Sequence, residues 1–248
     1  MSEPPRKKRD GPMTMRQALE LDGRRVTFSS GSTTLDGVLE GGFRTGELVE
    51  VFGASNTGKT QLAMQSAISV ASQARASVAF IDTEGQFRPE RLSSICVNRD
   101  VDPATVLPRV YSVRAENTRR QVEAIARLRR EKELSNCKMV IVDTLTKNFT
   151  LEYAGSKMAG KRQTALGAYL NRLSRDAYLH DRAVVLLNRV ASVGSDGNER
   201  EVDIGGETVR HFAQKVVYLR RSGEFVMASR ADENGAEVRT KITDSGLE

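Results

Sequence analysis

The stretch that decides the fold is GASNTGKT at residues 53–60, which follows the apolar run ELVEVF and leads into QLAMQSAISVASQ. The octet matches the pattern GxxxxGK[ST] in full through Gly53, Gly58, Lys59 and Thr60. Consecutive backbone N–H groups in such a loop, together with the N-terminus of the following helix, form a nest for phosphate. Its position between a predicted strand and a predicted helix separates it from an ordinary glycine-containing turn. The sequence therefore predicts a nucleotide-binding loop.

Each residue type in the octet suits the binding of a nucleoside triphosphate with magnesium. We expect Lys59 to reach the β- and γ-phosphates and the Thr60 hydroxyl to coordinate Mg²⁺, while the backbone surrounds the phosphates. The predicted nucleotide-binding set is Gly53, Ala54, Ser55, Asn56, Thr57, Gly58, Lys59, Thr60 and Gln61.

Two apolar runs further along the chain end in carboxylates. KMVIVD ends at Asp143 and VAFIDTE ends at Glu84. Because the C-terminal ends of parallel strands meet at one crevice, both should face the nucleotide. We expect Asp143 to help hold Mg²⁺ and Glu84 to orient and deprotonate the attacking water. The alternative role for Glu84 or its neighbour Asp82 is to cap the next helix.

Strand-like and helix-like segments alternate after the octet. The runs ASVAFIDTE, KMVIVDTL and AVVLLNRV are apolar enough to be buried strands covered on both faces. The run NTRRQVEAIARLRREKE predicts an amphipathic helix with Val122, Ile125 and Leu128 inward and arginines outward. This alternation predicts an α/β fold with a mostly parallel central sheet flanked by helices. Three later runs, KVVYLRR, EFVMASR and EVRTKIT, predict antiparallel strands added at the C-terminal edge.

Composition limits the class of protein. The 248 residues are 39% apolar, which suits a globular chain with a core, and the net charge of +6 permits a polyanionic partner without requiring one. The chain contains no run of 18 apolar residues, so we expect no membrane span. The N-terminal MSEPPRKKRDGP is not followed by an apolar segment, so we expect no secretory signal. Cys96 and Cys137 lack metal-binding spacing, so we expect buried, reduced thiols in an intracellular protein.

The chain divides into three expected parts. Residues 1–12 form a basic tail that we expect to be disordered, either a solvated leader or an arm for phosphates. Residues 13–30 form a linker with a possible oligomerisation segment, and residues 31–248 form the ATPase core. Inside the core, ASVGSDGNEREVDIGGE at residues 191–207 predicts a long polar loop.

Several segments carry a resemblance to a known family. FIDTEGQFRPERL, residues 80–92, closely resembles the archaeal and eukaryotic branch of the RecA/RadA recombinase family. SSGSTTLDGVLEGGFRTGELVEVFG, EYAGSKMAGKRQTALGAYLNRL and DIGGETVRHFAQKVVYLRR resemble other segments of that branch, in the same order. The resemblance covers residues 13–248 and implies a RecA-like ATPase core that forms filaments on single-stranded DNA and pairs homologous strands.

The resemblance also implies roles for individual residues. Glu84 would be the catalytic glutamate, and Arg91 would stack its flat guanidinium on the adenine. His211 would link the first DNA-binding loop to the nucleotide at a subunit interface, or would alternatively be a packed core histidine. The residues implied for the first DNA-binding loop are Lys157, Lys161 and Arg162.

The segment MRQALELDGRR, residues 15–25, aligns with the family's short oligomerisation segment. Met15 stands where the family has an aromatic anchor, and Ala18 stands where it has an alanine. Methionine is an adaptable anchor but fills an aromatic pocket less fully. The alternative is a plain amphipathic turn.

The chain also departs from the family pattern. Arg189 replaces a glutamine that senses the γ-phosphate and signals to the second DNA-binding loop, and Ser156 replaces an arginine of the first loop. The second loop carries acids that repel DNA phosphates, namely Asp196, Glu199, Glu201 and Asp203. We expect no helix-hairpin-helix domain ahead of the core. These departures favour a paralogue that assists the main recombinase, or a minimal recombinase core.

The sequence thus predicts a DNA-dependent ATPase of homologous recombination and DNA repair that uses ATP and Mg²⁺. Its expected partners are single-stranded DNA and further subunits, as a filament, a ring or a complex with a main recombinase. The alternative is a KaiC-type regulatory ATP-binding module without DNA strand exchange. The segment 152–163 with its basic GKRQ favours DNA, and the absence of a visible acceptor pocket or lid motif disfavours a small-molecule kinase.

Overall fold

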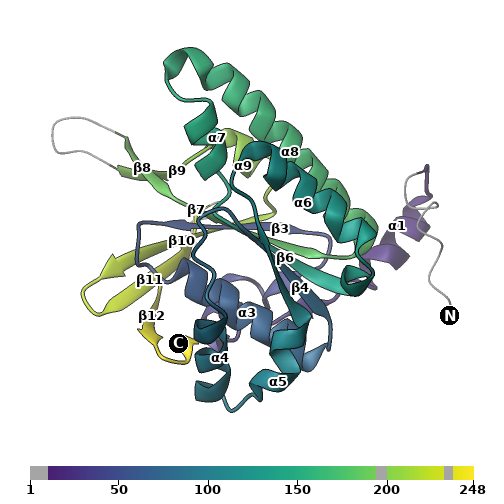
Figure 1. Ribbon diagram of the computed structural model, residues 1–248, viewed down its shortest axis with the longest axis vertical. Coiled ribbons are helices and arrows are strands. Elements are labelled where there is room, and N and C mark those ends of the chain that lie inside the picture. The colour runs from purple at the N-terminus through teal and green to yellow at the C-terminus, as the bar shows by residue number, and fades with distance from the viewer. Residues whose placement is uncertain (1–10, 194–199, 232–236) are drawn as a thin grey trace.

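The computed structural model describes residues 11–193, 200–231 and 237–248. At its centre lies a nine-stranded sheet with the order β13-β12-β11-β10-β3-β7-β6-β4-β5 (Figure 1). The parallel strands are β10 (Lys215–Ser222), β3 (Leu48–Gly53), β7 (Ala183–Asn188), β6 (Cys137–Asp143), β4 (Ser77–Asp82) and β5 (Val110–Arg114). The antiparallel strands are β11 (Phe225–Arg230), β12 (Val238–Thr243) and β13 (Gly246–Leu247). The predicted fold class is confirmed, with antiparallel strands at the C-terminal edge. The run KVVYLRR, expected to be one of these antiparallel strands, is instead β10, which pairs in parallel with β3 and in antiparallel fashion only with β11.

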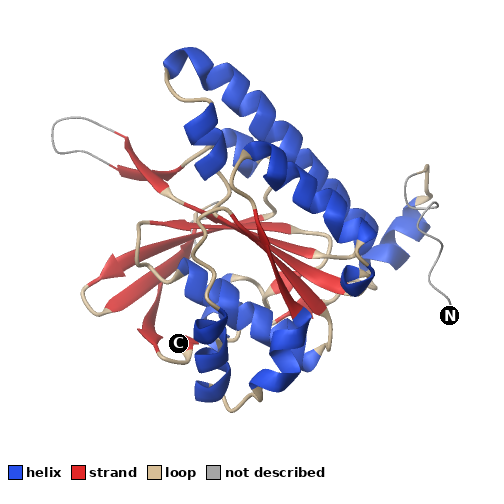
Figure 2. Cartoon of the chain, viewed as in Figure 1, coloured by secondary structure: helices blue, strands red, loops and turns tan. Residues whose placement is uncertain are grey.

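Helices cover both faces of the sheet (Figure 2). One face carries α3 (Lys59–Gln73), α4 (Pro89–Asn98) and α5 (Pro103–Val106). The opposite face carries α6 (Thr118–Arg130), α7 (Lys147–Glu152), α8 (Ala159–His180) and α9 (Glu207–Arg210). This three-layer arrangement leaves the C-terminal ends of the parallel strands at one edge of the sheet, where the loops that follow them meet.

The strands read as continuous apolar runs because alternate residues enter different cores. On β4, Val78 and Phe80 join the core under α3, whereas Ala79 and Ile81 join the core under α6 and α8. A strand buried on both faces needs an apolar residue at every position. The burial of α6 through Ile125 and Leu128 matches the inward face that the sequence predicted.

The segment before the phosphate loop contains elements that the sequence did not separate. These are α1 (Met15–Asp22), β1 (Thr27–Phe28), α2 (Thr33–Val38) and β2 (Phe43–Arg44). Helix α1 begins at a capping box in which Thr14 and Gln17 bond each other's backbone N–H groups. Residues 1–10 of the expected tail lie outside the described residues, and the division of the chain at residues 12 and 30 stays an expectation.

The stretch 191–207 is not a featureless loop. Strand β8 (Val190–Val193) pairs in antiparallel fashion with β9 (Arg200–Asp203), and α9 follows. The strand-forming runs are only four residues long, which is too short for alternation to identify them. Residues 194–199, which include two of the predicted acids, lie outside the described residues.

Two further expectations concern the whole chain. Cys96 and Cys137 are buried free thiols, as predicted. Burial raises the pKa of each thiol to about 11, which keeps both protonated at neutral pH. Within the described ranges, no helix combines the length and apolar character needed to cross a bilayer.

Candidate active site

The predicted phosphate loop runs from the end of β3 to the start of α3 (Figure 1). Gly53 is needed where the loop leaves the sheet, because a Cβ there would lie 2.2 Å from the carbonyl oxygen of Leu219. Gly58 precedes α3 with a φ of 87°, in the left-handed region that glycine adopts readily. Since α3 begins at Lys59, the N–H groups of its first turn remain available to an anion.

The Lys59 side chain folds back onto this loop. Its Nζ donates hydrogen bonds to the carbonyl oxygens of Gly53 at 2.8 Å and Ala54 at 2.6 Å. Burial lowers the pKa of Lys59 to about 8, with Asp143 opposing the change and Arg189 adding to it. The ammonium therefore lies in the loop without a full anionic counterpart, which a bound phosphate would provide.

A hydroxyl and a carboxylate suited to magnesium lie next to the loop. The Thr60 hydroxyl donates to Asp143 Oδ2 at 2.8 Å. Burial raises the pKa of Asp143, against the hydrogen bonds from Thr60 and Thr144, and the charges of Glu84 and Asp82 raise it further. A buried carboxylate with acidic neighbours fits a bound cation, and Mg²⁺ prefers oxygen ligands of this kind. Thr60 and Asp143 are thus the residues that would hold the metal.

A tight turn after β4 carries Glu84. The Asp82 carboxylate accepts backbone N–H groups from Gly85 at 2.7 Å, Gln86 at 3.3 Å and Phe87 at 3.1 Å. Helix α4 begins later, after Arg88, and no side chain caps it. The capping alternative for Asp82 and Glu84 is therefore wrong, and Asp82 instead fixes the backbone of the turn.

The Glu84 carboxylate lies between two cations that follow other strands. Arg189 Nη2, just beyond β7, lies 2.7 Å from Oε1, and Lys147 Nζ, just beyond β6, lies 3.4 Å from Oε2. The Glu84 side chain is only 12% exposed, so both cations approach it in a partly desolvated place. The sequence predicted Glu84 and Arg189 near the phosphates but neither their pairing nor any role for Lys147.

Arg91 lies beside the first turn of α3. It donates a hydrogen bond to Gln61 Oε1, and Gln61 Nε2 donates to the carbonyl oxygen of Thr243 at 2.9 Å. The structure therefore brings Arg91 and Gln61 together at the loop, next to the C-terminal strands. Stacking of Arg91 on an adenine stays a prediction.

A buried polar network connects the end of β7 to the second predicted DNA-binding loop. Asn188 donates to Glu50 Oε1 at 2.7 Å and to the carbonyl oxygen of Ile204 at 2.6 Å, and it accepts a bond from the Thr146 hydroxyl at 2.7 Å. Burial raises the pKa of Glu50 to about 8, and the charge of Asp203 raises it further. No sequence pattern pointed to this network, because its members come from four separate segments.

The predicted DNA-contacting residues lie at the start of α8. Lys157, in the short helix Ser156–Met158, and Lys161 are exposed. Arg162 is partly buried and donates to the carbonyl oxygen of Tyr153 at 2.8 Å, so it also shapes the turn before α8. The structure therefore presents the two lysines to solvent on one turn and gives the arginine a structural contact.

The acids of the second predicted loop are partly neutralised within the chain. Tyr218 donates its hydroxyl to Glu201 at 2.6 Å, and Arg210 pairs with the buried Asp203 at 2.5 Å. Asp196 and Glu199 lie outside the described residues. The expected repulsion of DNA is therefore weaker than the count of acids implies at Asp203, whose charge Arg210 compensates, whereas Tyr218 orients Glu201 without cancelling its charge.

The remaining predicted residues lie on short helices. His211 follows α9 and is exposed, with its ring edge-on to Phe212, so the alternative of a packed core histidine is wrong. Met15 on α1 is 76% exposed and Ala18 is half-buried. Leu19 on the same helix is 73% exposed, so α1 presents two mostly exposed apolar side chains.

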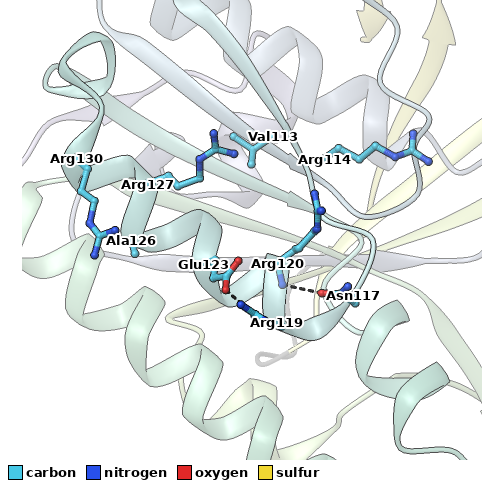
Figure 3. Close-up of a pocket in the computed structure, with 9 residues that line it drawn as sticks. All are labelled: Val113, Arg114, Asn117, Arg119, Arg120, Glu123, Ala126, Arg127 and Arg130. Carbon is cyan, nitrogen blue, oxygen red and sulfur yellow. Dashed lines mark hydrogen bonds and ion pairs between the residues drawn. The ribbon is translucent and has the colours of Figure 1, made fainter.

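The outward arginines of α6 line a groove against the edge strand β5 (Figure 3). The groove has a volume of about 850 Å³. Arg119 is paired with Glu123 at 2.8 Å across one turn of the helix. The arginines that line the groove are Arg114, Arg119, Arg120, Arg127 and Arg130.

Comparisons with known proteins agree with this geometry. The Rad51 family model matches residues 23–245. The meiotic recombination protein DMC1 of Saccharomyces cerevisiae is 33% identical over an alignment of 236 residues that covers 89% of this chain and 67% of DMC1. The DNA repair and recombination protein RadA of Metallosphaera sedula is 32% identical over an alignment of 244 residues that covers 93% of this chain and 75% of that protein. RadA of Cenarchaeum symbiosum is 33% identical over 203 residues, 79% of this chain and 51% of its own length.

The match to the family model spans most of the chain, and two of these relatives are covered over two thirds or more of their length. With the phosphate loop, Asp143 and Glu84 at one edge of a parallel sheet, the chain belongs to the Rad51 family of RecA/RadA-type recombinases.

Proposed function

We propose that the chain is an ATPase of homologous recombination and DNA repair whose hydrolysis responds to single-stranded DNA. One observation carries the proposal: the phosphate loop after β3, the Thr60–Asp143 pair and Glu84 lie at the same edge of the sheet. Membership of the Rad51 family supports recombination and repair as the process. No comparison favours the KaiC-type alternative.

The chemistry follows from the positions of these groups. ATP binds with its phosphates against the loop, where Thr60 and Asp143 would hold Mg²⁺, and the metal would supply positive charge that offsets the charge of the phosphates. A water molecule forms a bond to the γ-phosphorus while the bond from that phosphorus to the ADP oxygen breaks. Glu84 accepts the proton that the water loses. Lys59 and the N–H groups of the first turn of α3 stabilise the charge that develops.

Arg189 is the residue proposed to respond to the γ-phosphate. In the structure its guanidinium pairs with Glu84, and within the described part of the chain it has no other ion-pair partner. A γ-phosphate carries more charge than one carboxylate and would compete for the guanidinium. Release of Glu84 and stabilisation of the transferring phosphoryl group by Arg189 would then occur together.

Partners are proposed from the exposed side chains. Lys157 and Lys161 contact phosphates of single-stranded DNA, and Arg162 shapes the turn that presents them. Met15 and Ala18 on α1 dock into another subunit, either a second copy or a main recombinase. We propose that the protein works in the compartment that holds the cellular DNA, the cytoplasm or nucleoid.

The test is an ATPase assay with and without single-stranded DNA, combined with DNA binding across a salt titration. We expect DNA to raise turnover and salt to weaken binding steeply, because phosphate contacts release counterions. Glu84→Gln should bind ATP but not hydrolyse it, whereas Glu90→Gln, an exposed control on α4, should hydrolyse it normally. Normal turnover by Glu84→Gln would refute the assignment of the base. No DNA binding at low salt would refute the DNA role and favour the KaiC-type alternative.

A further inference from the structure

We infer that Lys147 is a positioning residue for ATP hydrolysis, which holds one oxygen of the Glu84 carboxylate while the other accepts the proton from water. The inference rests on the proposed role of Glu84 as the base. Nothing in the chemistry of the phosphate loop requires a lysine at this place, so its contacts are the basis of the argument.

The ammonium of Lys147 contacts two neighbouring residues of the turn after β4: the side chain of Glu84 and the backbone of Thr83. Its Nζ lies 3.4 Å from Glu84 Oε2 and donates to the carbonyl oxygen of Thr83 at 2.9 Å. Thr83 is itself fixed to the end of β6, because its N–H donates to the Asp143 carbonyl at 2.8 Å and its hydroxyl donates to the Thr144 carbonyl at 2.9 Å. The hydrogen bond to this anchored carbonyl therefore helps to hold the Lys147 ammonium beside Glu84.

The two cations on Glu84 differ in how firmly they are held. Lys147 is 28% exposed and contacts Oε2, whereas Arg189 is 54% exposed and contacts Oε1. Among the described residues, Thr83 gives the Lys147 ammonium a second partner, and the Arg189 guanidinium has no comparable one. When Arg189 turns to the γ-phosphate, Oε1 becomes free to accept a proton. Oε2 stays bound to Lys147, so the carboxylate keeps its orientation.

The position of Lys147 in the chain supports a functional reason for it. Lys147 is the first residue of α7, where the positive end of the helix dipole disfavours a cation. No acidic residue lies in that first turn to compensate it locally. Residues that are unfavourable for their local secondary structure are expected mainly at functional sites. The compensating negative charge is Glu84, across the active site.

The chemical step gains from this arrangement through orientation. As the water oxygen bonds to phosphorus, its proton passes to Oε1, and the electrons of the broken O–H bond remain on the oxygen that joins the phosphate. A base held by one fixed contact needs less reorganisation than one free to rotate, and misplacement by about 1 Å can cost about 100-fold in rate. Removal of the Lys147 charge should therefore lower kcat and leave ATP binding nearly unchanged.

The test compares Lys147→Met, Lys147→Arg, Glu84→Gln and the Lys147→Met/Glu84→Gln double variant, with Lys132→Met as the control. Lys132 is an exposed lysine in the turn before β6, far from the phosphate loop in the fold. For each variant, kcat and KM for ATP are measured with saturating single-stranded DNA, alongside the thermal unfolding midpoint. We expect Lys147→Met to lower kcat by about 10- to 100-fold, with KM within about twofold. Lys147→Arg should recover most of kcat because it retains a cation, and the double variant should be no slower than Glu84→Gln.

Each outcome bears on the inference separately from the proposed function. If Lys147→Met keeps a wild-type kcat while Glu84→Gln is inactive, Glu84 remains the base and the positioning role is wrong. A rise in KM alone, or a loss that adds to that of Glu84→Gln, would also overturn it. If Lys147→Met lowers the unfolding midpoint, the result for Lys147→Arg decides the question, provided that this variant unfolds at the wild-type midpoint. A low kcat in Lys147→Arg would then contradict the inference. Normal turnover by Glu84→Gln would instead refute the proposed base.

Discussion

Replacement of the buried Glu50 by glutamine should change how the stability of the protein depends on pH. Glu50 lies on β3 with a fully buried side chain, and Asn188 bonds its Oε1 at 2.7 Å. Within the described residues, its Oε2 has no hydrogen-bond partner. Burial raises the pKa of Glu50 from 4.5 to about 8, and nearby Asp203 adds to this, while Asn188 and Arg210 oppose it. The folded protein therefore keeps a proton on Glu50 that the unfolded chain releases.

The sign and size of the effect follow from that proton. Below pH 4.5 both states are protonated and Glu50 costs nothing, whereas between pH 4.5 and about 8 the folded state binds more protons. Stability therefore falls as pH rises through this window, by about 1.4 kcal/mol for each pH unit. The total reaches about 4 kcal/mol at pH 8, where the folded-state carboxyl is itself half ionised, and this is close to the stability of many domains.

The assay is urea unfolding of the wild type and Glu50→Gln at pH 5, 6, 7 and 8. The glutamine is neutral throughout and can still accept the bond from Asn188. We expect the two proteins to be nearly equal at pH 5 and the variant to be more stable by about 4 kcal/mol at pH 8. Glu90→Gln, an exposed control, should follow the wild type at every pH. Parallel curves for the wild type and Glu50→Gln would refute the reasoning and show that Glu50 is ionised in the folded state.

Three other predictions concern the phosphate loop and the DNA face. Gly53→Ala should lose about 3 kcal/mol of stability, because its Cβ would lie 2.2 Å from a carbonyl oxygen, whereas Gly160→Ala, with nothing within 4 Å, should be neutral or stabilising. ATP binding should take up nearly one proton at pH 9 and almost none at pH 7, since Lys59 has a pKa of about 8 in the free protein and phosphate favours its charged form. Calorimetry in buffers of different ionisation enthalpy measures that uptake, and none at pH 9 would contradict the lowered pKa. Combined Lys157→Ala and Lys161→Ala should reduce the salt slope of single-stranded DNA binding by about 1.4, and an unchanged slope would remove both lysines from the DNA contact.

The sequence predicted those helices and strands whose formation depends on residues close together in the chain. Helix α3 (Lys59–Gln73) begins at the lysine of the octet, the buried strands β4 and β7 fall within the predicted runs, and β6 begins one residue before its predicted run, at Cys137. The short pair β8 and β9 was missed because four-residue strands carry almost no periodic signal. Local patterns were therefore sufficient for the long elements alone.

The candidate site likewise has a part that the sequence predicted and a part that it did not. Gly53, Lys59 and Thr60 belong to one contiguous motif, so their places could be predicted. The pairing of Glu84 with Lys147 and Arg189 could not, because three strands must first be placed side by side in the order β7-β6-β4. The network around Asn188 was missed for the same reason.

The contacts of α3 with the C-terminal strands also have a consequence for the time course of folding. Gln61 bonds the Thr243 carbonyl, and Gln65 bonds both the carbonyl and the N–H of Leu247, in each case across 182 residues of chain. Such contacts form slowly, because a long loop must close before they stabilise anything. On the ribosome, the phosphate loop is synthesised early but cannot reach its native surroundings until residue 247 has emerged. Nucleotide binding therefore reports completion of the sheet, and ATP added to a refolding chain should bind only in the last kinetic phase.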